Sequence, residues 1–188
     1  MRVRSMPIVI AALAAVTLPA ASAAAAPLKG VFHIASGSYI RLRDPSSGPF
    51  FSNPYSADAD KTYTLLTAGS AGGLRTGTTQ GAPATPFDSK GDSLAGKIIK
   101  PTNFAGILFG VVTTSAPSIS VSGNKLSGQV NGLVAEWNNQ TFKQGAKVTG
   151  TYNSRTRDYD LTWTSLVSGG PFNGFTGYWN LQGTFSAS

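Results

Sequence analysis

Two stretches in the last third of the chain, residues 148–152 and 159–163, alternate strictly between apolar or small residues and polar ones. This alternation indicates half-buried β-strands, because successive side chains of a strand point to opposite faces of a sheet. The six residues between the stretches, 153–158, are all polar, so the pair is predicted to form a β-hairpin. The apolar face of this hairpin carries Val148, Tyr152, Tyr159, Leu161 and Trp163.

The same pattern predicts a second hairpin and a last strand. Residues 119–121 and 126–130 alternate on either side of Gly123-Asn124, and these two residue types tolerate the positive φ angles of a tight turn. The last predicted strand places Trp179, Leu181 and Phe185 on one side and Tyr178, Asn180 and Gln182 on the other.

Earlier segments are less regular. Residues 107–112 form a continuous apolar run that is typical of a strand covered on both faces. No segment after the N-terminal region has the 3.6-residue stripe of a long amphipathic helix. The predicted fold class is therefore all-β, an antiparallel β-sandwich or partly closed β-barrel with little helix. Three further short strands are expected at Phe32 and Ile34, at Ile40 and Leu42, and at Tyr63 and Leu65.

Residues 1–26 have the parts of a secretory signal peptide. Two arginines precede an apolar run at residues 8–18, which is followed by small residues around 21–23. The run is shorter than the roughly 20 apolar residues that a membrane-spanning helix needs. We expect cleavage after Ala23, or after Ala25 at the latest. The mature chain would then be secreted or extracellular, or else periplasmic or loosely surface-associated.

Residues 27–188 are predicted to form a single all-β domain, with a long loop rich in proline and glycine around residues 78–96. The chain has no cysteine, so the exported domain has neither disulfides nor thiol chemistry. The formal net charge is +7, and without Arg2 and Arg4 the chain has 13 basic and 8 acidic residues, a net charge of +5. These charges are scattered; the close pairs Arg41/Arg43 and Arg155/Arg157 are interpreted as solvated strand or turn positions. We expect no nucleic-acid partner.

Two short motifs suggest catalysis but lack their partners. Gly91-Asp92-Ser93-Leu94 spells the nucleophile block of the GDSL esterases, yet the single histidine, His33, lies far upstream and the surrounding sequence is loop. Ser122 and Lys125 have the spacing of the penicillin-binding enzymes, but they fall on the predicted hairpin turn. No catalytic residue is assigned.

No metal or other cofactor is expected. One histidine and no cysteine exclude the usual zinc ligand sets. Calcium takes oxygen ligands, so the pairs Asp58/Asp60 and Asp158/Asp160 are conceivable donors. A solvated strand face or a loop is the simpler interpretation of both pairs, since each is a very incomplete ligand set.

The candidate ligand-binding residues lie around the sole glutamate and in the glycine-rich loop at 169–174. Glu136 is expected on the outward side of the strand that contains Leu133, Ala135 and Trp137. Trp163 and Trp179 are predicted core residues, whereas Trp137 and the phenylalanines of the loop are candidates for exposed aromatic surfaces that stack on sugar rings. The candidate set is Trp137, Glu136, Phe172, Asn173 and Phe175.

Three segments, residues 63–80, 136–138 and 163–183, resemble uncharacterised exported bacterial β-rich proteins, some of which carry a C-terminal PEP-CTERM sorting anchor. The Gly-Gly-Pro-Phe-Asn-Gly block at 169–174 is the most specific part of the resemblance. The resemblance implies bacterial export and a β fold, and it brings no activity, cofactor or catalytic residue. The sequence ends at residues 184–188 without an apolar tail or a basic cluster, so no anchor is expected, and this favours release or loose surface association.

Two hypotheses for the function follow. The first is a secreted non-catalytic β-module that is either structural or binds an extracellular or surface ligand such as polysaccharide. The alternative is a small secreted carboxylate-dependent hydrolase, glycosidase-like, which would need an aspartate facing Glu136 across a cleft. The expected partner is an extracellular polysaccharide or the cell surface, without stable membrane insertion. The sequence does not specify an oligomeric state.

Overall fold

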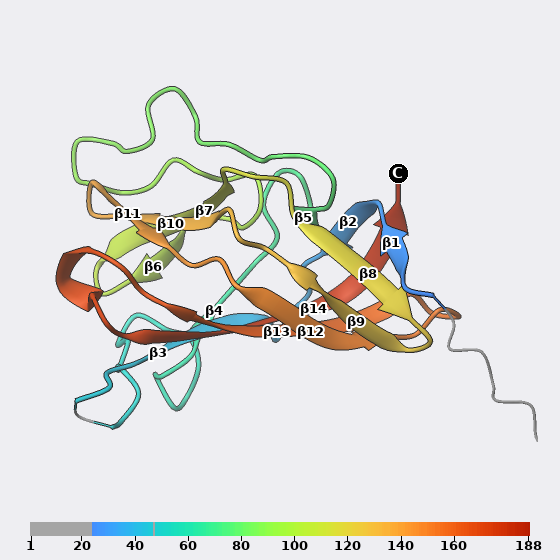
Figure 1. The fold of residues 1–188 in the computed structure, drawn as a ribbon. Coiled ribbons are helices and arrows are strands. Elements are labelled where there is room, and N and C mark those ends of the chain that lie inside the picture. The colour runs from blue at the N-terminus through green and yellow to red at the C-terminus, as the bar shows by residue number, and fades with distance from the viewer. Residues whose placement is uncertain (1–23, 47) are drawn as a thin grey trace, which may run out of the picture.

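The computed structural model describes residues 24–46 and 48–188, and these form two antiparallel β-sheets packed face to face (Figure 1). The larger sheet curls like half of a barrel, and the smaller sheet covers one end of it. No α-helix occurs among the described residues; a single 3₁₀ turn, η1, spans Gly170–Phe172. The predicted all-β fold class is confirmed.

The large sheet has the strand order β1-β8-β9-β12-β13-β14-β2-β5, with β3 paired to β14 and β4 paired to β3. Its curl follows from β14, which pairs with β3 through residues 176–180 and with β2 through residues 185–187. The strands are β1 (Ala26–Leu28), β2 (Gly30–His33), β3 (Tyr39–Arg43), β4 (Thr64–Leu65), β5 (Gly73–Arg75), β8 (Ser118–Ser122), β9 (Lys125–Gln129), β12 (Lys147–Tyr152), β13 (Asp158–Leu166) and β14 (Thr176–Ala187).

The small sheet has the order β11-β10-β7-β6. Its central strand β7 is the continuous apolar run, and residues 109–113 are all buried, as predicted for a strand covered on both faces. Its strands are β6 (Thr102–Phe104), β7 (Ile107–Thr113), β10 (Leu133–Trp137) and β11 (Gln140–Lys143).

Both predicted hairpins are present. Strands β12 and β13 pair with Tyr152 opposite Tyr159, and strands β8 and β9 pair with Val121 opposite Leu126. Gly123 in the turn between β8 and β9 has φ 59°, a conformation that glycine adopts without steric cost. Ser122 and Lys125 are paired across this turn, in accordance with their interpretation as turn residues.

In one predicted strand, the alternation of buried and exposed side chains is the reverse of the prediction. Thr64 and Leu66 are buried, whereas Tyr63 is half-buried and Leu65 is exposed. The prediction took Tyr63 and Leu65 as the apolar side of a half-buried strand. The Thr64 hydroxyl is accommodated inside because it accepts a hydrogen bond from Asn53 Nδ2 (3.0 Å).

The core lies between the two sheets and along the inside of the curl. Trp163 and Trp179 are buried there with their rings stacked, 5.3 Å between centroids and 5° between planes. The indole N–H of Trp163 donates to Gln144 O, and that of Trp179 donates to Gln144 Oε1, both at 3.2 Å. Both tryptophans therefore occupy the predicted core.

Residues 76–101 contain no named strand and run over the outer side of the small sheet, coloured green in Figure 1. This loop is held to β7 by hydrogen bonds from Ser93 N to Leu108 O (2.9 Å) and from Leu108 N to Asp92 Oδ1 (2.6 Å). The small sheet is therefore enclosed between the large sheet and the loop.

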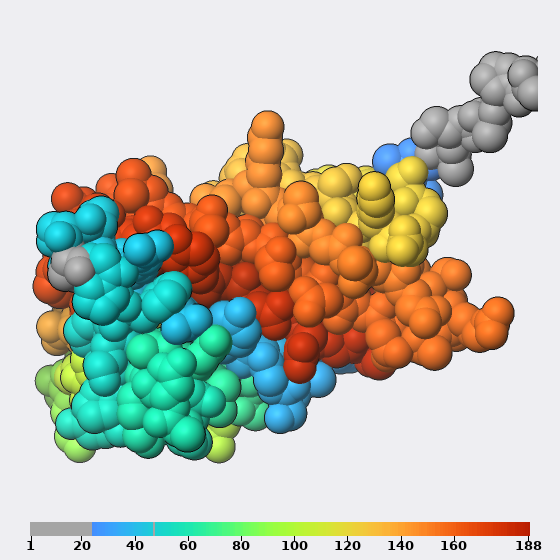
Figure 2. All heavy atoms as spheres, turned by 90° about the horizontal axis from the view of Figure 1, so that it is seen from below, coloured from blue at the N-terminus to red at the C-terminus, as the bar shows by residue number. Residues whose placement is uncertain are grey.

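Seen from below in Figure 2, the C-terminal strands, orange and red, spread across the large sheet, and the segment after β3, cyan, lies at one end. None of the described residues forms a helix that is long and apolar enough to cross a membrane. The predicted signal peptide falls largely outside the described residues, which begin at residue 24.

Candidate functional site

Strand β10 places the predicted site residues on two different faces of the small sheet. Trp137 and Ala135 point toward the large sheet, and Glu136 points to the opposite side, because neighbouring side chains of a strand alternate. The predicted ligand-binding set is therefore divided between two places.

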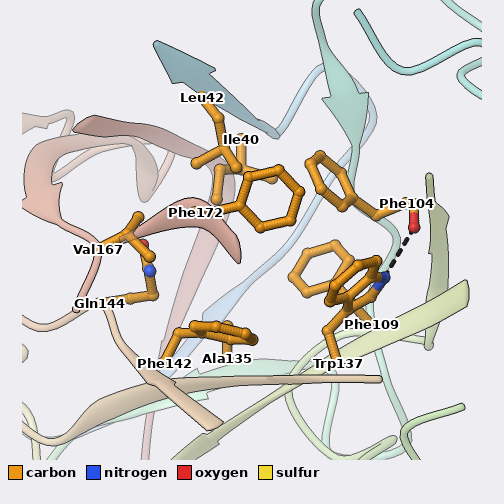
Figure 3. Close-up of a pocket in the computed structure, with 10 residues that line it drawn as sticks. All are labelled: Ile40, Leu42, Phe104, Phe109, Ala135, Trp137, Phe142, Gln144, Val167 and Phe172. Carbon is orange, nitrogen blue, oxygen red and sulfur yellow. Dashed lines mark hydrogen bonds between the residues drawn. The ribbon is translucent and has the colours of Figure 1, made fainter. Parts of the chain in front are cut away.

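The inner face of β10 lines a cavity of about 40 Å³ between the two sheets (Figure 3). The half-buried ring of Trp137 forms part of its wall, and the indole N–H donates to Phe104 O (2.8 Å). Trp137 thus faces the interior of the sandwich rather than a loop edge. The lining residues are Ile40, Leu42, Phe104, Phe109, Ala135, Trp137, Phe142, Gln144, Val167 and Phe172.

The predicted loop residues meet Trp137 at this cavity. The Phe172 ring lies 5.4 Å from the Trp137 ring and 5.5 Å from the Phe175 ring, measured between centroids. Asn173 remains at the surface, where its Oδ1 accepts a hydrogen bond from Gly169 N (2.9 Å) and closes the loop. The structure therefore brings three aromatic candidates together and gives Asn173 a local structural contact.

Glu136 points to the outward side of β10, away from Ala135 and Trp137, as expected, but this side is not solvated. The side chain is only 2% exposed, because the loop at 76–101 covers this side of the sheet. The buried Ser93 hydroxyl donates to Glu136 Oε2 (3.2 Å). Gly110, opposite Glu136 on β7, makes room for this contact, since a Cβ there would lie 2.5 Å from Ser93 Oγ.

Burial raises the pKa of the Glu136 carboxyl above its usual range, and the hydrogen bond from Ser93 partly opposes that rise. Desolvation favours the neutral acid, whereas a donor to the carboxylate favours the charged form. The serine of the esterase-like motif is therefore a partner of Glu136. It has no histidine beside it, because His33 lies on β2, where its Nε2 is 2.7 Å from Ser186 Oγ.

Glu136 also lines a groove of about 450 Å³ on the outer side of the small sheet. Among the described residues, no donor lies within hydrogen-bond distance of Glu136 Oε1. No aspartate is among the described residues that line this groove. They are Ala82, Val112, Thr114, Ser115, Asn131, Gly132, Val134, Glu136, Thr141 and Lys143.

The aspartates of the two pairs considered as calcium ligands make hydrogen bonds or an ion pair with nearby residues. Asp58 Oδ2 accepts from Asp60 N (3.0 Å), and Asp60 Oδ2 lies 3.8 Å from Arg41 Nη2. Asp158 Oδ2 accepts from Thr156 Oγ1 (2.6 Å), and Asp160 Oδ1 accepts from Asn180 Nδ2 (2.9 Å). Within the described part of the chain, no group of three or more histidine, cysteine or acidic side chains is arranged to hold a metal ion.

Arg41 differs from its interpretation as a solvated strand position. Its guanidinium lies 3.6 Å from the ring centroid of Phe50 and 4.0 Å from that of Tyr63. It also donates to Tyr63 Oη (2.9 Å) and Thr62 Oγ1 (2.8 Å). Arginine stacks on aromatic faces because its planar cation is weakly hydrated, so the segment after β3 is fastened to the large sheet by this residue.

No protein-family model, curated protein or solved structure matches the chain. The resemblance to exported bacterial β-rich proteins therefore stays a prediction.

The sequence analysis missed Ser93 as a partner of Glu136, Gln144 as a cavity residue, and the polar residues that line the groove, such as Lys143. Ser93 lies 43 positions from Glu136, and no local pattern shows that the loop folds back over β10. Strand β11 was also missed, although Asn138 and Asn139, with φ 50° and 57°, form the kind of two-residue turn that joins hairpin strands.

Proposed function

We propose that the mature chain is an exported, non-catalytic binding module, and that the groove beside Glu136 binds a hydroxyl-rich ligand such as a sugar unit of an extracellular polysaccharide. One observation carries this proposal. The Glu136 side chain is almost fully buried and its Oε2 accepts from Ser93, whereas Oε1 has no protein donor among the described residues and Glu136 lines the groove. Among the described residues only Arg41 Nε is fully buried without a partner, so Glu136 Oε1 keeps access to solvent, and a ligand hydroxyl in the groove is a suitable donor to it.

The size and lining of the groove support a small polar ligand. Its volume of about 450 Å³ lies within the range of protein ligand sites, roughly 300 to 1,000 Å³. The hydroxyls of Thr114, Ser115 and Thr141 and the ammonium group of Lys143 offer hydrogen bonds. The neighbouring valines of β7 and β10, Val112 and Val134, offer an apolar patch against which the C–H face of a sugar ring packs.

A glycosidase-like hydrolase has less support. Such enzymes use two carboxyl groups on either side of the scissile bond. Glu136 is the only acidic residue among the described residues that line the groove. Binding without turnover is therefore the function that the groove supports best.

Binding of the mature chain to a panel of bacterial polysaccharides, measured on a glycan array and by pulldown, tests the proposal. Lys143→Ala should weaken binding about tenfold or more, because a hydrogen bond to a charged group is worth about 1.5 to 3 kcal/mol. Thr141→Val keeps the shape of the side chain and removes its hydroxyl, so it should weaken binding by a smaller factor.

Lys147→Ala is the matched control, since Lys147 is also an exposed lysine but lies on β12 in the large sheet. It changes the net charge equally and should leave binding unchanged. The proposal fails if no polysaccharide binds, or if Lys143→Ala and Lys147→Ala weaken binding equally, since equal losses would indicate unspecific attraction to a basic protein.

A further inference from the structure

The groove beside Glu136 follows the outer side of β10, and strand pairing sets the order of its lining residues. Glu136 lies opposite Gly110 of β7, and Val134 lies opposite Val112. Alternate residues of a strand share a face and lie about 6.6 Å apart along it. The groove therefore extends along the outer face of the small sheet, starting from Glu136.

Strand β11 contributes two polar side chains to the same groove. Thr141 lies directly opposite Glu136, and Lys143 lies opposite Val134. Both side chains are exposed, and neither the Thr141 hydroxyl nor the Lys143 ammonium has a hydrogen-bond or ion-pair partner within the described part of the chain. Glu136 Oε1, the Thr141 hydroxyl and the Lys143 ammonium thus form a set of neighbouring groups that a ligand can engage.

The carboxyl of Glu136 is held in one orientation. Ser93 Oγ accepts from Ala95 N (3.1 Å), which leaves the serine proton for Glu136 Oε2. Oε1 is then the oxygen available to the groove, and in the ionised carboxylate it only accepts hydrogen bonds. This end of the groove is suited to a hydroxyl of the ligand.

The groove carries an excess of positive charge beyond Glu136. An ammonium group has three donors and no acceptor, so an anion is its strongest partner. Among the described residues, no carboxylate oxygen lies within 4 Å of Lys143 Nζ. A second ammonium, that of Lys97, reaches Gly81 O (3.5 Å), next to the lining residue Ala82. Burial adds to the excess, because it raises the pKa of the Glu136 carboxyl.

We infer that the ligand is a sugar unit with a carboxylate, a uronic acid of an acidic polysaccharide, whose carboxylate pairs with Lys143 while a hydroxyl donates to Glu136 Oε1. The inference rests on the proposed function and adds the class of sugar. Glu136 and Lys143 are diagonal neighbours on paired strands, a spacing of about 7 to 8 Å. One uronic acid ring spans this distance, because its carboxylate and its hydroxyls lie on opposite sides of the ring.

Short oligosaccharides test the inference without the multiple attachment that a polymer allows. Trimers of galacturonate and of mannuronate are each compared with their methyl esters by titration calorimetry of the mature protein. Physiological ionic strength screens unspecific attraction, and EDTA prevents calcium from bridging carboxylates. An acid and its ester differ mainly in charge. The better acid trimer should bind about tenfold or more tightly than its ester, the factor expected for a hydrogen bond between charged groups.

Variants assign this preference to Lys143. Lys143→Met removes the ammonium and keeps most of the side-chain length, so acid and ester should then bind alike. Lys147→Met is the matched control, because Lys147 is also an exposed strand lysine but lies on β12 in the large sheet, and it should keep the preference. Thr141→Val should weaken acid and ester by the same factor, since it leaves the charge of the groove unchanged.

Several results would overturn the inference. These are equal affinity of the wild type for acid and ester, no binding of either acid, and a preference that survives Lys143→Met. Equal losses in Lys143→Met and Lys147→Met, or binding of sulfated maltotriose as tight as that of the better acid, would indicate general attraction of anions to a basic protein and would also overturn it.

The proposed function fails by a different result. If the esters or a neutral polysaccharide bind and Thr141→Val weakens that binding, the groove is a sugar site and only the preference for a uronic acid is wrong. If no saccharide, acidic or neutral, binds the mature protein, the proposed function is wrong as well.

Discussion

At the scale of single residues, the three tryptophans differ in what they hold together. Trp163 and Trp179 stack on each other at 5% and 3% exposure and share Gln144 as their acceptor. Trp137 is half-buried and contacts rings that come from the small sheet and from η1. The first two belong to the centre of the fold, and the third belongs to the rim of the cavity.

Replacing these residues should therefore give two sizes of effect. We expect Trp163→Ala and Trp179→Ala each to lower the free energy of unfolding by about 3 to 5 kcal/mol, the usual cost of truncating a buried tryptophan. Trp137→Ala should cost less, because its ring is only half-buried. Urea unfolding of the three variants measures this order, and a loss for Trp137→Ala as large as the other two would show that its ring is primarily a core element.

Glu136 makes the stability of the protein depend on pH. Its pKa is raised in the folded state by burial, so the folded state binds a proton more tightly than the unfolded chain does. The free energy of unfolding should then fall as the pH rises from the usual glutamate pKa, about 4.3, through the raised folded value.

Glu136→Gln should remove this fall, because glutamine still accepts from Ser93 and does not titrate. The difference in unfolding free energy between variant and wild type should grow in favour of the variant across that pH range and then stay constant. Urea melts of both proteins at several pH values measure it, and contributions from other groups cancel in the difference. Parallel curves for the two proteins would contradict the prediction.

At the scale of elements, the sequence predicted the strands whose pattern is carried by large apolar side chains. Both hairpins and the inner face of β14, with Trp179, Leu181 and Phe185, follow directly from alternation. Alternation failed at β4, where a hydrogen-bonded threonine is inside. It also gave no indication that the loop covers Glu136, because that burial depends on a contact across 43 residues.

Strand β1 is an element that the sequence did not predict. Ala26–Leu28 pairs with β8 at the edge of the large sheet, where Leu28 lies opposite the buried Ile119, and Leu28 O accepts from Thr76 Oγ1 (2.6 Å). Pro27 is tolerated there because an edge strand has one side without ladder hydrogen bonds. Cleavage after Ala23 or Ala25 would leave this strand intact.

Deleting residues 24–28 should destabilise the mature protein. The change removes β1 with the half-buried Leu28 and uncovers part of β8, which together should cost about 1.5 kcal/mol, or roughly 3 to 6 °C in melting temperature. Deletion of residues 24 and 25 alone is the control, since these two residues lie outside the strand. Equal melting temperatures for the two truncated proteins would show that β1 contributes nothing to stability.

At the scale of the whole molecule, stability rests on burial between a curled sheet, a small sheet and a long covering loop. The β14 strand connects most of this architecture, because it pairs with β13, β3 and β2. The chain has no cysteine, and the aspartates of both candidate calcium pairs are engaged in turns or cross-strand contacts. The architecture therefore contains no disulfide, and we expect it to need no metal ion.

The melting temperature of the mature protein should accordingly be the same in buffer alone, in dithiothreitol and in EDTA. A reductant has no disulfide to break. A chelator lowers stability only if it removes an ion that binds the folded state, because such an ion raises the free energy of unfolding by RT ln(1 + [ion]/Kd). Scanning calorimetry in the three buffers measures this.

A fall of several degrees in EDTA that added calcium reverses would contradict the prediction and point to the Asp58/Asp60 or Asp158/Asp160 pair. Asp60→Asn and Asp158→Asn would then identify the pair, because only the variant at the true site would lose its response to calcium.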